Sequence, residues 1–176
     1  MTEIIGEGKY ARFIRRDNWE YVERPDTSGV VVIVAVTEQD ALIMVEQHRV
    51  PVGGPVIELP AGLAGDKEFT GEELEAAAAR ELEEETGYRA GRFDHLRRGP
   101  TSAGLIAEVV DLYYARDLVQ VGPGGGDASE DITVHEIKLS EIGQWLSDIE
   151  AEGRLVDPKV YTALYFIARE RGTISF

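Results

Sequence analysis

Residues 80–88 read Arg-Glu-Leu-Glu-Glu-Glu-Thr-Gly-Tyr, and this acidic run predicts a helix whose charges are placed unfavourably. At about 100° per residue, Glu81, Glu84 and Glu85 fall within one arc of about 100° on the helix surface. Carboxylates at i and i+4 repel each other, and the negative end of the helix dipole adds to that cost where Gly87 would end the helix. A divalent metal ion would compensate for this arrangement, because hard oxygen ligands on one face suit Mg²⁺ or Mn²⁺.

A solvated acidic face is the ordinary alternative for such a run. The neighbouring sequence favours a helix that is partly buried. Thr70-Gly71-Glu72-Glu73 has the spacing of a capping box and predicts the helix start, and the run 75–79 consists of strong helix formers. Leu74, Ala78 and Leu82 repeat at helical spacing and predict a narrow buried stripe next to the carboxylates. Partly buried carboxylates need charge compensation more than exposed ones do.

Length, charge and cysteine content narrow the class of protein. A chain of 176 residues most often forms one domain with its own core. No run approaches the ~20 apolar residues of a membrane span, and the N-terminus lacks the basic-then-apolar pattern of a signal peptide. The absence of cysteine fits a reducing cytoplasm, where we expect the protein. A net charge of −15 argues against binding a nucleic-acid polymer, but a bound metal and a few arginines still allow a small phosphorylated substrate.

The rest of the sequence predicts strands and helices in mixed order. Apolar or alternating runs bounded by turn residues predict strands at 10–14, 19–23, 30–36, 41–46, 56–59, 93–97, 109–115 and 132–139. Ser140 and the Asp157-Pro158 pair predict the starts of two helices, and the glycines of 122–126 predict a mobile loop. Because no regular βαβ order is present, we expect the α+β class or a mixed-sheet sandwich.

The acidic helix also carries a family resemblance. Its residues 80–88, with Glu72 preceding them, resemble the Nudix box of the Nudix hydrolases, and the second half of that pattern matches at every fixed position. The first half departs from the pattern. The family glycine would fall at Asp66, whereas this chain has Gly62, which indicates a short loop insertion within 65–69.

Shorter segments resemble one subfamily, the ADP-ribose and nucleoside-diphosphate-sugar pyrophosphatases. They are Glu46-Gln47-His48-Arg49-Val50-Pro51, Glu58-Leu59-Pro60-Ala61-Gly62, Ser102-Ala103-Gly104 through Glu108, and Glu130-Asp131-Ile132-x-Val134. Ala103 replaces a proline that is usual in the third segment. Each segment is short, and their order and spacing carry the likeness.

This resemblance implies the fold, the domain organisation and the assembly. Residues 29–176 are expected to form the α/β/α sandwich of the Nudix hydrolases with a mixed sheet, and residues 1–28 to form a small β-hairpin arm. A two-stranded hairpin is at best marginally stable alone. The sugar-nucleotide group implies a homodimer in which such arms reach the partner and complete its substrate pocket.

The expected metal ligands are Glu81 and Glu85, with Glu84 close enough to join them or to hold a metal-bound water. The resemblance adds the backbone carbonyl of Ala61. It also gives the role of a late catalytic carboxylate to Glu130, the expected general base, with a helix glutamate as the alternative. Mg²⁺ is the expected cofactor and Mn²⁺ the second choice.

The residues expected to contact the substrate are Arg24, Arg49, Glu58, Ser102 and Gly104. Arg49 follows a strand and suits bidentate phosphate binding, with a surface ion pair as the alternative. Glu58 alternates with buried residues and is expected to face a cleft. Arg24 is expected near a nucleobase, with packing or a subunit contact as the alternative for this hairpin.

These features predict metal-dependent hydrolysis of the pyrophosphate bond of a nucleoside diphosphate sugar such as ADP-ribose, which gives a nucleoside monophosphate and a sugar phosphate. The base and the sugar are not identified by these residues. Two alternatives stay open: a Nudix hydrolase of nucleoside triphosphates or dinucleoside polyphosphates, and a non-catalytic Nudix domain that senses nucleotides. Arg80 is expected to make either an ion pair that orients the helix or a substrate contact, and Glu72 is its expected structural partner.

Overall fold

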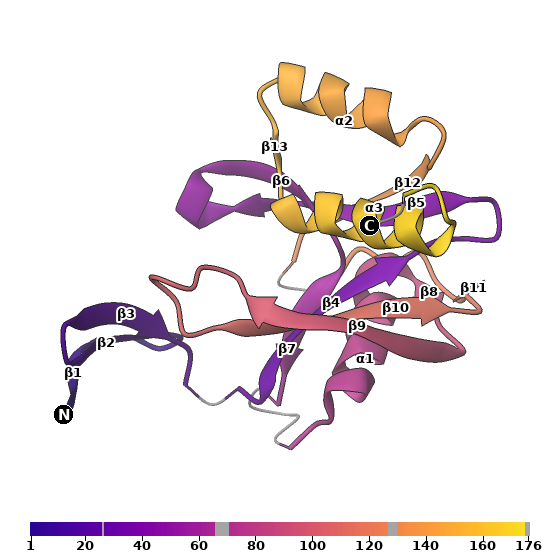
Figure 1. Ribbon diagram of the computed structural model, residues 1–176. Coiled ribbons are helices and arrows are strands. Elements are labelled where there is room, and N and C mark those ends of the chain that lie inside the picture. Colours follow the sequence, from indigo (N-terminus) through magenta and orange to yellow (C-terminus); the bar gives the residue numbers. More distant parts are fainter. Residues whose placement is uncertain (26, 66–70, 127–129, 175–176) are drawn as a thin grey trace.

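The computed structural model describes residues 1–25, 27–65, 71–126 and 130–174, and Figure 1 shows how their strands and helices are arranged. One four-stranded sheet has the order β7-β4-β10-β9 and contains β4 (Gly29–Ala35), β7 (Ala61–Ala64), β9 (Arg92–Pro100) and β10 (Val109–Arg116). A second has the order β12-β5-β6-β13 and contains β5 (Ala41–Arg49), β6 (Gly54–Glu58), β12 (Ile132–Lys138) and β13 (Leu155–Val156). Both sheets are mixed, because β10 runs parallel to β4 and β13 runs parallel to β6.

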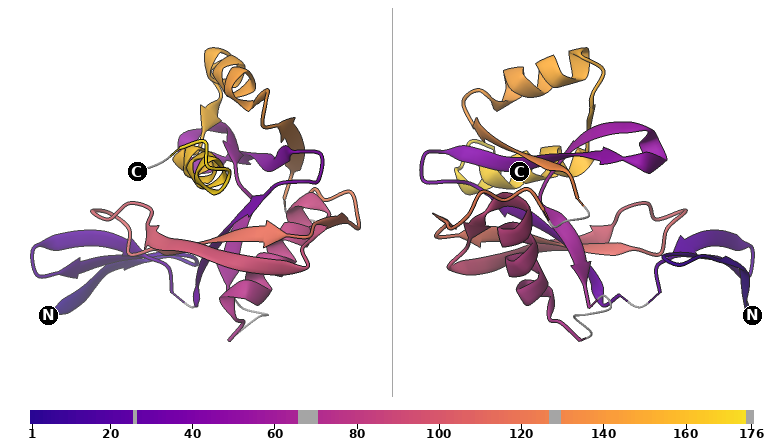
Figure 2. Two further views of the ribbon diagram at one scale, coloured as in Figure 1. Left: turned by 45° about the vertical axis from the view of Figure 1, so that its right-hand side comes forward. Right: turned by 180° about the vertical axis from the view of Figure 1, so that it is seen from behind.

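Helices cover both faces of the sheet that contains β4 and β10 (Figures 1 and 2). Helix α1 (Leu74–Thr86) shares one core cluster with Ile33 and Tyr113. Helices α2 (Ile142–Ala151) and α3 (Pro158–Glu170) share the other cluster with Val34 and Tyr114, which point to the opposite face of the same two strands. The α/β/α sandwich that the resemblance implied is therefore confirmed.

The buried stripe of α1 follows the sequence prediction, but its start does not. Ala78 and Leu82 are fully buried, and Leu74 packs against the same cluster. The helix begins at Leu74 with Glu73 as its N-cap, and the Glu73 side chain makes no capping hydrogen bond. The capping box predicted an earlier start, and its Thr70 lies outside the described residues. Among the described residues, packing of Leu74 against the core, and not a hydrogen bond from Glu73, holds this end of the helix.

The C-terminal end of α1 is held by a loop from elsewhere in the chain. Gly87 adopts the left-handed conformation predicted for it, with φ of 73°. Strands β8 (Tyr88–Arg89) and β11 (Val119–Gln120) then pair, which leads residues 121–126 across the helix end. The NH groups of Gly125 and Gly126 donate to the carbonyls of Glu85 and Glu84 at 2.8 and 3.0 Å. The glycine-rich stretch predicted as a mobile loop is thus hydrogen-bonded to α1.

The N-terminal arm is a three-stranded sheet, where the sequence predicted a hairpin. The predicted pair is present as β2 (Arg12–Arg16) and β3 (Trp19–Glu23), and β1 (Thr2–Glu7) adds a strand on the other side of β2. Figures 1 and 2 show this sheet projecting from the rest of the molecule. It meets the β9–β10 loop through Val22, whose NH donates to the Leu105 carbonyl at 2.8 Å.

The two C-terminal helices differ in how they begin. Asp157 caps α3 as predicted, and its side chain accepts a hydrogen bond of 2.7 Å from the Lys159 NH. Ser140 was predicted to cap α2, but that helix begins at Ile142 after Glu141, and no side chain caps it.

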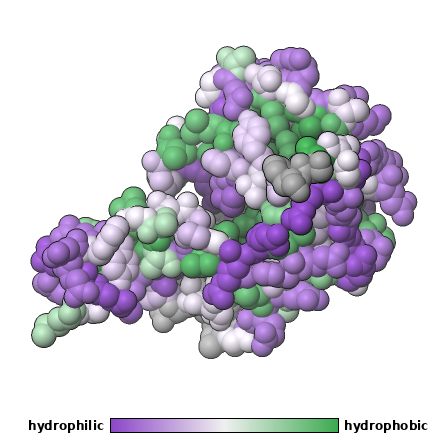
Figure 3. Space-filling view, in the orientation of Figure 1, coloured by the Kyte–Doolittle hydropathy of each residue, from purple (hydrophilic) through white to green (hydrophobic). Residues whose placement is uncertain are grey.

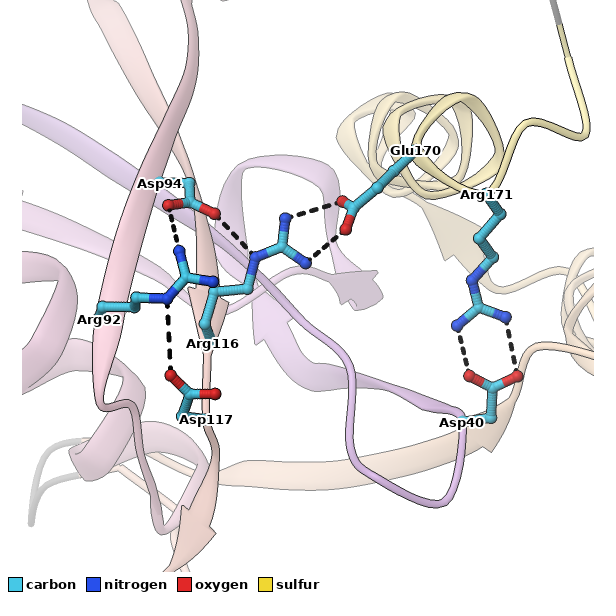
Figure 4. Close-up of polar contacts among 7 residues, drawn as sticks. All are labelled: Asp40, Arg92, Asp94, Arg116, Asp117, Glu170 and Arg171. Atoms are coloured by element: carbon cyan, nitrogen blue, oxygen red, sulfur yellow. Dashed lines mark hydrogen bonds and ion pairs between the residues drawn. The ribbon is translucent and has the colours of Figure 1, made fainter.

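Ion pairs join the end of α3 to the sheets, as Figure 4 shows. Both Nη atoms of Arg116 donate to Glu170 at 2.8 Å, and its Nε donates to Asp94 at 2.8 Å. Arg171 makes a bidentate ion pair with Asp40 in the β4–β5 turn. These contacts attach the end of α3 to β9, to β10 and to the β4–β5 turn.

Gly53 and Gly87 allow a matched test of the loop that holds α1, because both have φ of 73°. A Cβ at Gly53 meets no atom within 4 Å, whereas a Cβ at Gly87 would lie 2.2 Å from the Gly122 carbonyl oxygen. We expect Gly53→Ala to lower the free energy of unfolding by about 1–2 kcal/mol, the cost of a left-handed residue with a side chain. Gly87→Ala should cost more, because the loop must also move. Urea denaturation measures both, and equal losses would contradict this contact.

Candidate active site

The acidic residues of α1 lie in its last turns, where the helix meets the beginning of β7. Glu85 is buried, with 2% of its surface exposed, and its Oε2 accepts a hydrogen bond of 3.1 Å from the Ala61 NH. Glu81 is mostly buried, and Glu84 is largely exposed. The structure therefore brings together the three predicted helix carboxylates and Ala61. Their predicted roles in metal binding remain proposals.

The position of Glu81 depends on a glycine in β7. A Cβ added to Gly62 would lie 2.0 Å from the carboxyl carbon and from Oε1 of Glu81. Any side chain at this position would displace the carboxylate. The sequence marked Gly62 in two ways, as the end of the segment 58–62 and as a glycine shifted from its place in the family pattern, and these were the available signals for this contact.

Arg80 supplies positive charge to the cluster. Its Nε and Nη2 donate to the two carboxylate oxygens of Glu72 at 3.1 Å each, and its Nη1 donates to Glu81 at 2.8 Å and to Glu84 at 3.1 Å. Its Nη2 also donates to the Leu63 carbonyl at 3.0 Å, a contact that the sequence did not predict. The hydrogen bonds with Glu72 raise the pKa of Arg80 above its ordinary value. Of the two predicted roles, the structure shows the ion pair, and the pairing with Glu72 is confirmed.

Burial disfavours the ionised form of two carboxyl groups in this cluster. It raises the pKa of Glu81 to about 7, against the opposing effect of Arg80. It raises the pKa of Glu85 to about 8, against the opposing hydrogen bond from Ala61. The negative charge of Glu130 raises the pKa of both groups further. Glu130, expected as the general base, therefore lies close to the helix carboxylates.

Arg49 and Glu58 lie next to this cluster, at the ends of β5 and β6. The Nε of Arg49 donates to Oε2 of Glu58 at 2.6 Å. The positive charge of Arg49 also lowers the pKa of Glu85, against the larger effect of burial. The ion pair weighed as an alternative for Arg49 is thus present, and its partner is another residue expected to bind substrate.

The other residues expected to bind substrate lie near the N-terminal sheet. Arg24 makes an ion pair of 3.6 Å with Glu108, and Ser102 and Gly104 lie in the loop between β9 and β10. A groove of about 310 Å³ runs between this loop and β3, and its lining includes Trp19 and Gly104. Figure 1 shows the N-terminal sheet on one side of the molecule and α1 towards the other. Within one chain, the residues predicted to form the site therefore lie in two separate groups, one at the end of α1 and one near the N-terminal sheet.

A divalent cation fits the chemistry of the acidic cluster. Within the described ranges, no three acidic or histidine side chains already form a metal-binding arrangement. The reason is visible in the contacts, because Glu81 and Glu84 turn to Arg80 and Glu85 turns to the Ala61 NH. The donors are nevertheless all hard oxygens, and the raised pKa values show that the ionised carboxylates are poorly stabilised here, which a bound cation would correct.

Comparisons with known proteins identify the family of this chain. Residues 26–164 match the family model described as NUDIX domain. The ADP-ribose pyrophosphatase of Bacillus subtilis (strain 168) is 38% identical over 123 residues, which are 69% of this chain and 63% of that protein. The methanol dehydrogenase activator of Bacillus methanolicus is 34% identical over 149 residues, which are 84% of this chain and 75% of that protein.

A solved structure, titled an ADP compounds hydrolase, has the same fold. It superposes with a TM-score of 0.72 and 19% identity, and the match covers 99% of this chain and 95% of that one. The predicted Nudix fold is therefore confirmed. In addition, no helix among the described residues is long and apolar enough to cross a membrane.

The raised carboxyl pKa values predict how stability depends on pH when no metal is bound. Between pH 4.5, the ordinary value, and about 8, folded Glu81 and Glu85 retain protons that the unfolded chain releases. The free energy of unfolding should therefore fall as pH rises through this window. Glu85→Gln should make that fall shallower. Urea denaturation in the presence of a chelator measures it, and identical slopes for both proteins would refute the pKa assignment.

Proposed function

This chain belongs to the Nudix family and is a hydrolase of that family, and we propose that it hydrolyses the pyrophosphate bond of a nucleoside diphosphate sugar. The proposed products are a nucleoside monophosphate and a sugar phosphate, and ADP-ribose is the first substrate to test, because the 38% identical relative is named for it. The observation that carries the proposal is the buried carboxylate cluster at the end of α1, because burial disfavours its ionised form and a metal that binds pyrophosphate would stabilise that form.

In this reaction a water oxygen attacks one phosphorus, and the bond from that phosphorus to the bridging oxygen breaks. Nudix hydrolases generally use divalent metal ions, which neutralise phosphate charge and lower the pKa of bound water. We propose that Glu81, Glu84, Glu85 and the carbonyl of Ala61 hold the metal. Oxygen donors of this kind suit Mg²⁺, with Mn²⁺ as the second choice.

We propose that Glu130 is the general base that accepts a proton from the attacking water. A general base must come within hydrogen-bond reach of the proton that it removes. Glu130 lies near enough to Glu81 and Glu85 for its charge to raise the pKa of both, which supports a place beside the proposed metal. A glutamate of the helix is the alternative base.

Arg49 is proposed to bind a phosphate group. It uses its Nε for Glu58, and its two Nη groups have no hydrogen-bond partner in the described part of the chain. A guanidinium with free donors in a fixed orientation matches phosphate oxygens well. Glu58, which fixes that orientation, is proposed to contact the substrate as well.

The function and the metal helix can be tested together. We expect release of nucleoside monophosphate from ADP-ribose in the presence of Mg²⁺, and a reduction of at least about a hundredfold, or about 3 kcal/mol, in Glu81→Gln and in Glu85→Gln. Each change keeps the shape of the side chain and removes its charge. Glu83→Gln is the matched control, because Glu83 pairs with Arg89 away from the cluster. The assay uses a panel that includes nucleoside triphosphates and dinucleoside polyphosphates.

The pattern over the panel separates the possible functions. Preferred hydrolysis of a triphosphate or a dinucleoside polyphosphate would replace the proposed substrate but keep the family activity. Binding without turnover of any compound would indicate a sensor. Turnover within a few-fold of wild type in both Glu81→Gln and Glu85→Gln would refute the role of the helix carboxylates.

We also propose that the protein is a homodimer in which residues 1–28 form an arm and residues 29–176 form the hydrolase domain. The arm exposes apolar side chains, including Ile4 at 53%, Tyr10 at 57% and Trp19 at 63%. Figure 3 shows hydrophobic residues among hydrophilic ones on this sheet. A partner that covers these residues would bring Arg24, Ser102 and Gly104 of one chain towards the carboxylates of the other, which would unite the two groups of predicted site residues.

Light scattering at micromolar concentration should give twice the mass of the chain. Deletion of residues 1–24 should give a monomer with lower activity, because it removes the exposed apolar side chains of the arm. A urea unfolding transition in the deletion variant verifies that the rest of the chain still folds. A full-length monomer, or a deletion variant with full activity, would contradict the dimer.

A further inference from the structure

The loop of residues 121–126 ends next to Glu130, and its attachment to α1 is made by the backbone. The NH groups of Val121 and Gly122 donate to the Gly87 carbonyl at 2.8 and 3.1 Å. The NH groups of Gly125 and Gly126 donate to the carbonyls of Glu85 and Glu84. The loop is therefore bonded to the same helical turn that carries two of the proposed metal ligands.

Gly126 lies directly against Glu130. It has φ of 79°, and a Cβ at this position would lie 2.6 Å from Oε2 of Glu130, 2.8 Å from its Cβ and 3.0 Å from Cδ1 of Ile132. Real Cβ atoms do not approach other atoms so closely, so any side chain here would shift Glu130. The Oε2 atom is the far end of a flexible side chain, but the Cβ of Glu130 is fixed to the backbone, so the backbone at Glu130 would have to shift as well.

From these contacts we infer that Gly126 is a positioning residue for Glu130. Hydrogen bonds fix Gly126 to the end of α1, and the bare Cα of Gly126 leaves room for the Glu130 carboxylate beside the carboxylates of that helix. The glycine thus sets the position of the proposed base relative to the proposed metal ligands. This inference rests on the proposed function, because it gives Gly126 a role only if Glu130 accepts the proton.

A side chain at position 126 should change the position of Glu130 without changing the residues proposed to bind metal and substrate. A methyl group at position 126 would meet side-chain atoms of Glu130 and Ile132, and none of its three nearest neighbours belongs to Glu81, Glu84 or Glu85. The main-chain NH that bonds to Glu84 is kept in an alanine variant. A purely structural role for Gly126 would instead lower stability without a specific change in kcat.

The experiment compares Gly126→Ala with Gly153→Ala. Gly153 has φ of 81°, close to the 79° of Gly126, but a Cβ there meets no atom within 4 Å. The backbone strain is matched, so Gly153→Ala measures the loss of stability in urea denaturation that comes from φ alone, and Gly126→Ala should lose at least as much because its Cβ also meets Glu130. We expect Gly126→Ala to lower kcat by at least about tenfold and leave KM within about threefold, since a positioned base contributes about 10²–10⁴-fold. Gly153→Ala should keep the kcat of the wild type.

The double variant with Glu130→Gln identifies the route of the effect. If Gly126 acts through Glu130, the substitution Gly126→Ala should cause no further loss of kcat in the Glu130→Gln background. Gly126→Asn provides a second test with less strain, because asparagine tolerates positive φ better than alanine. It should also lower kcat in the wild-type background and not in the Glu130→Gln background.

Two results would overturn the inference while leaving the proposed function intact. One is a kcat for both Gly126 variants equal to that of Gly153→Ala while Glu130→Gln is impaired. The other is a double variant in which the fold-losses of kcat caused by Gly126→Ala and by Glu130→Gln multiply, as they do for residues that act independently. A wild-type kcat for Glu130→Gln would overturn both the inference and the proposed role of Glu130.

Discussion

Arg80 donates to Glu72, to Glu81 and to the Leu63 carbonyl, and in this way it links the start of α1, its acidic turns and β7. Acidic side chains this close together repel each other, and a planar guanidinium with five donors offsets part of that repulsion in a fixed geometry. Burial nevertheless outweighs this effect and raises the pKa of Glu81 to about 7. The poor stabilisation of the ionised carboxylates is the physical reason for proposing a metal here.

The parts of this site that depend on neighbours in sequence were predictable. Helical periodicity was sufficient to place Glu81, Glu84 and Glu85 on one face, because α1 is regular over those turns. The contacts that fix their positions were not predictable, since they join distant segments. Glu85 needs the NH of Ala61, and Glu81 needs the bare Cα of Gly62 in β7, a strand that the sequence did not reveal.

Two further differences between expectation and structure have a similar cause. The glycines of 122–126 suggested freedom of movement, because a glycine has no side chain to restrict it. Here that lack of a side chain permits close packing, and a Cβ at Gly124 would lie 2.4 Å from the carbonyl carbon of Thr86. Likewise, β1 consists entirely of exposed residues, so no buried periodicity marks it as a strand. In both segments backbone hydrogen bonds and close backbone packing determine the structure. The pattern of apolar and polar side chains therefore does not predict it.

The hydrogen bonds from Gly125 and Gly126 to α1 have a dynamic consequence. Each time this contact opens, both amide hydrogens become accessible to solvent, so their exchange with deuterium reports the separation of the loop from the helix. Such local openings cost less free energy than global unfolding and leave the core intact. A few backbone bonds would thus set how often residues 121–126 separate from the end of α1.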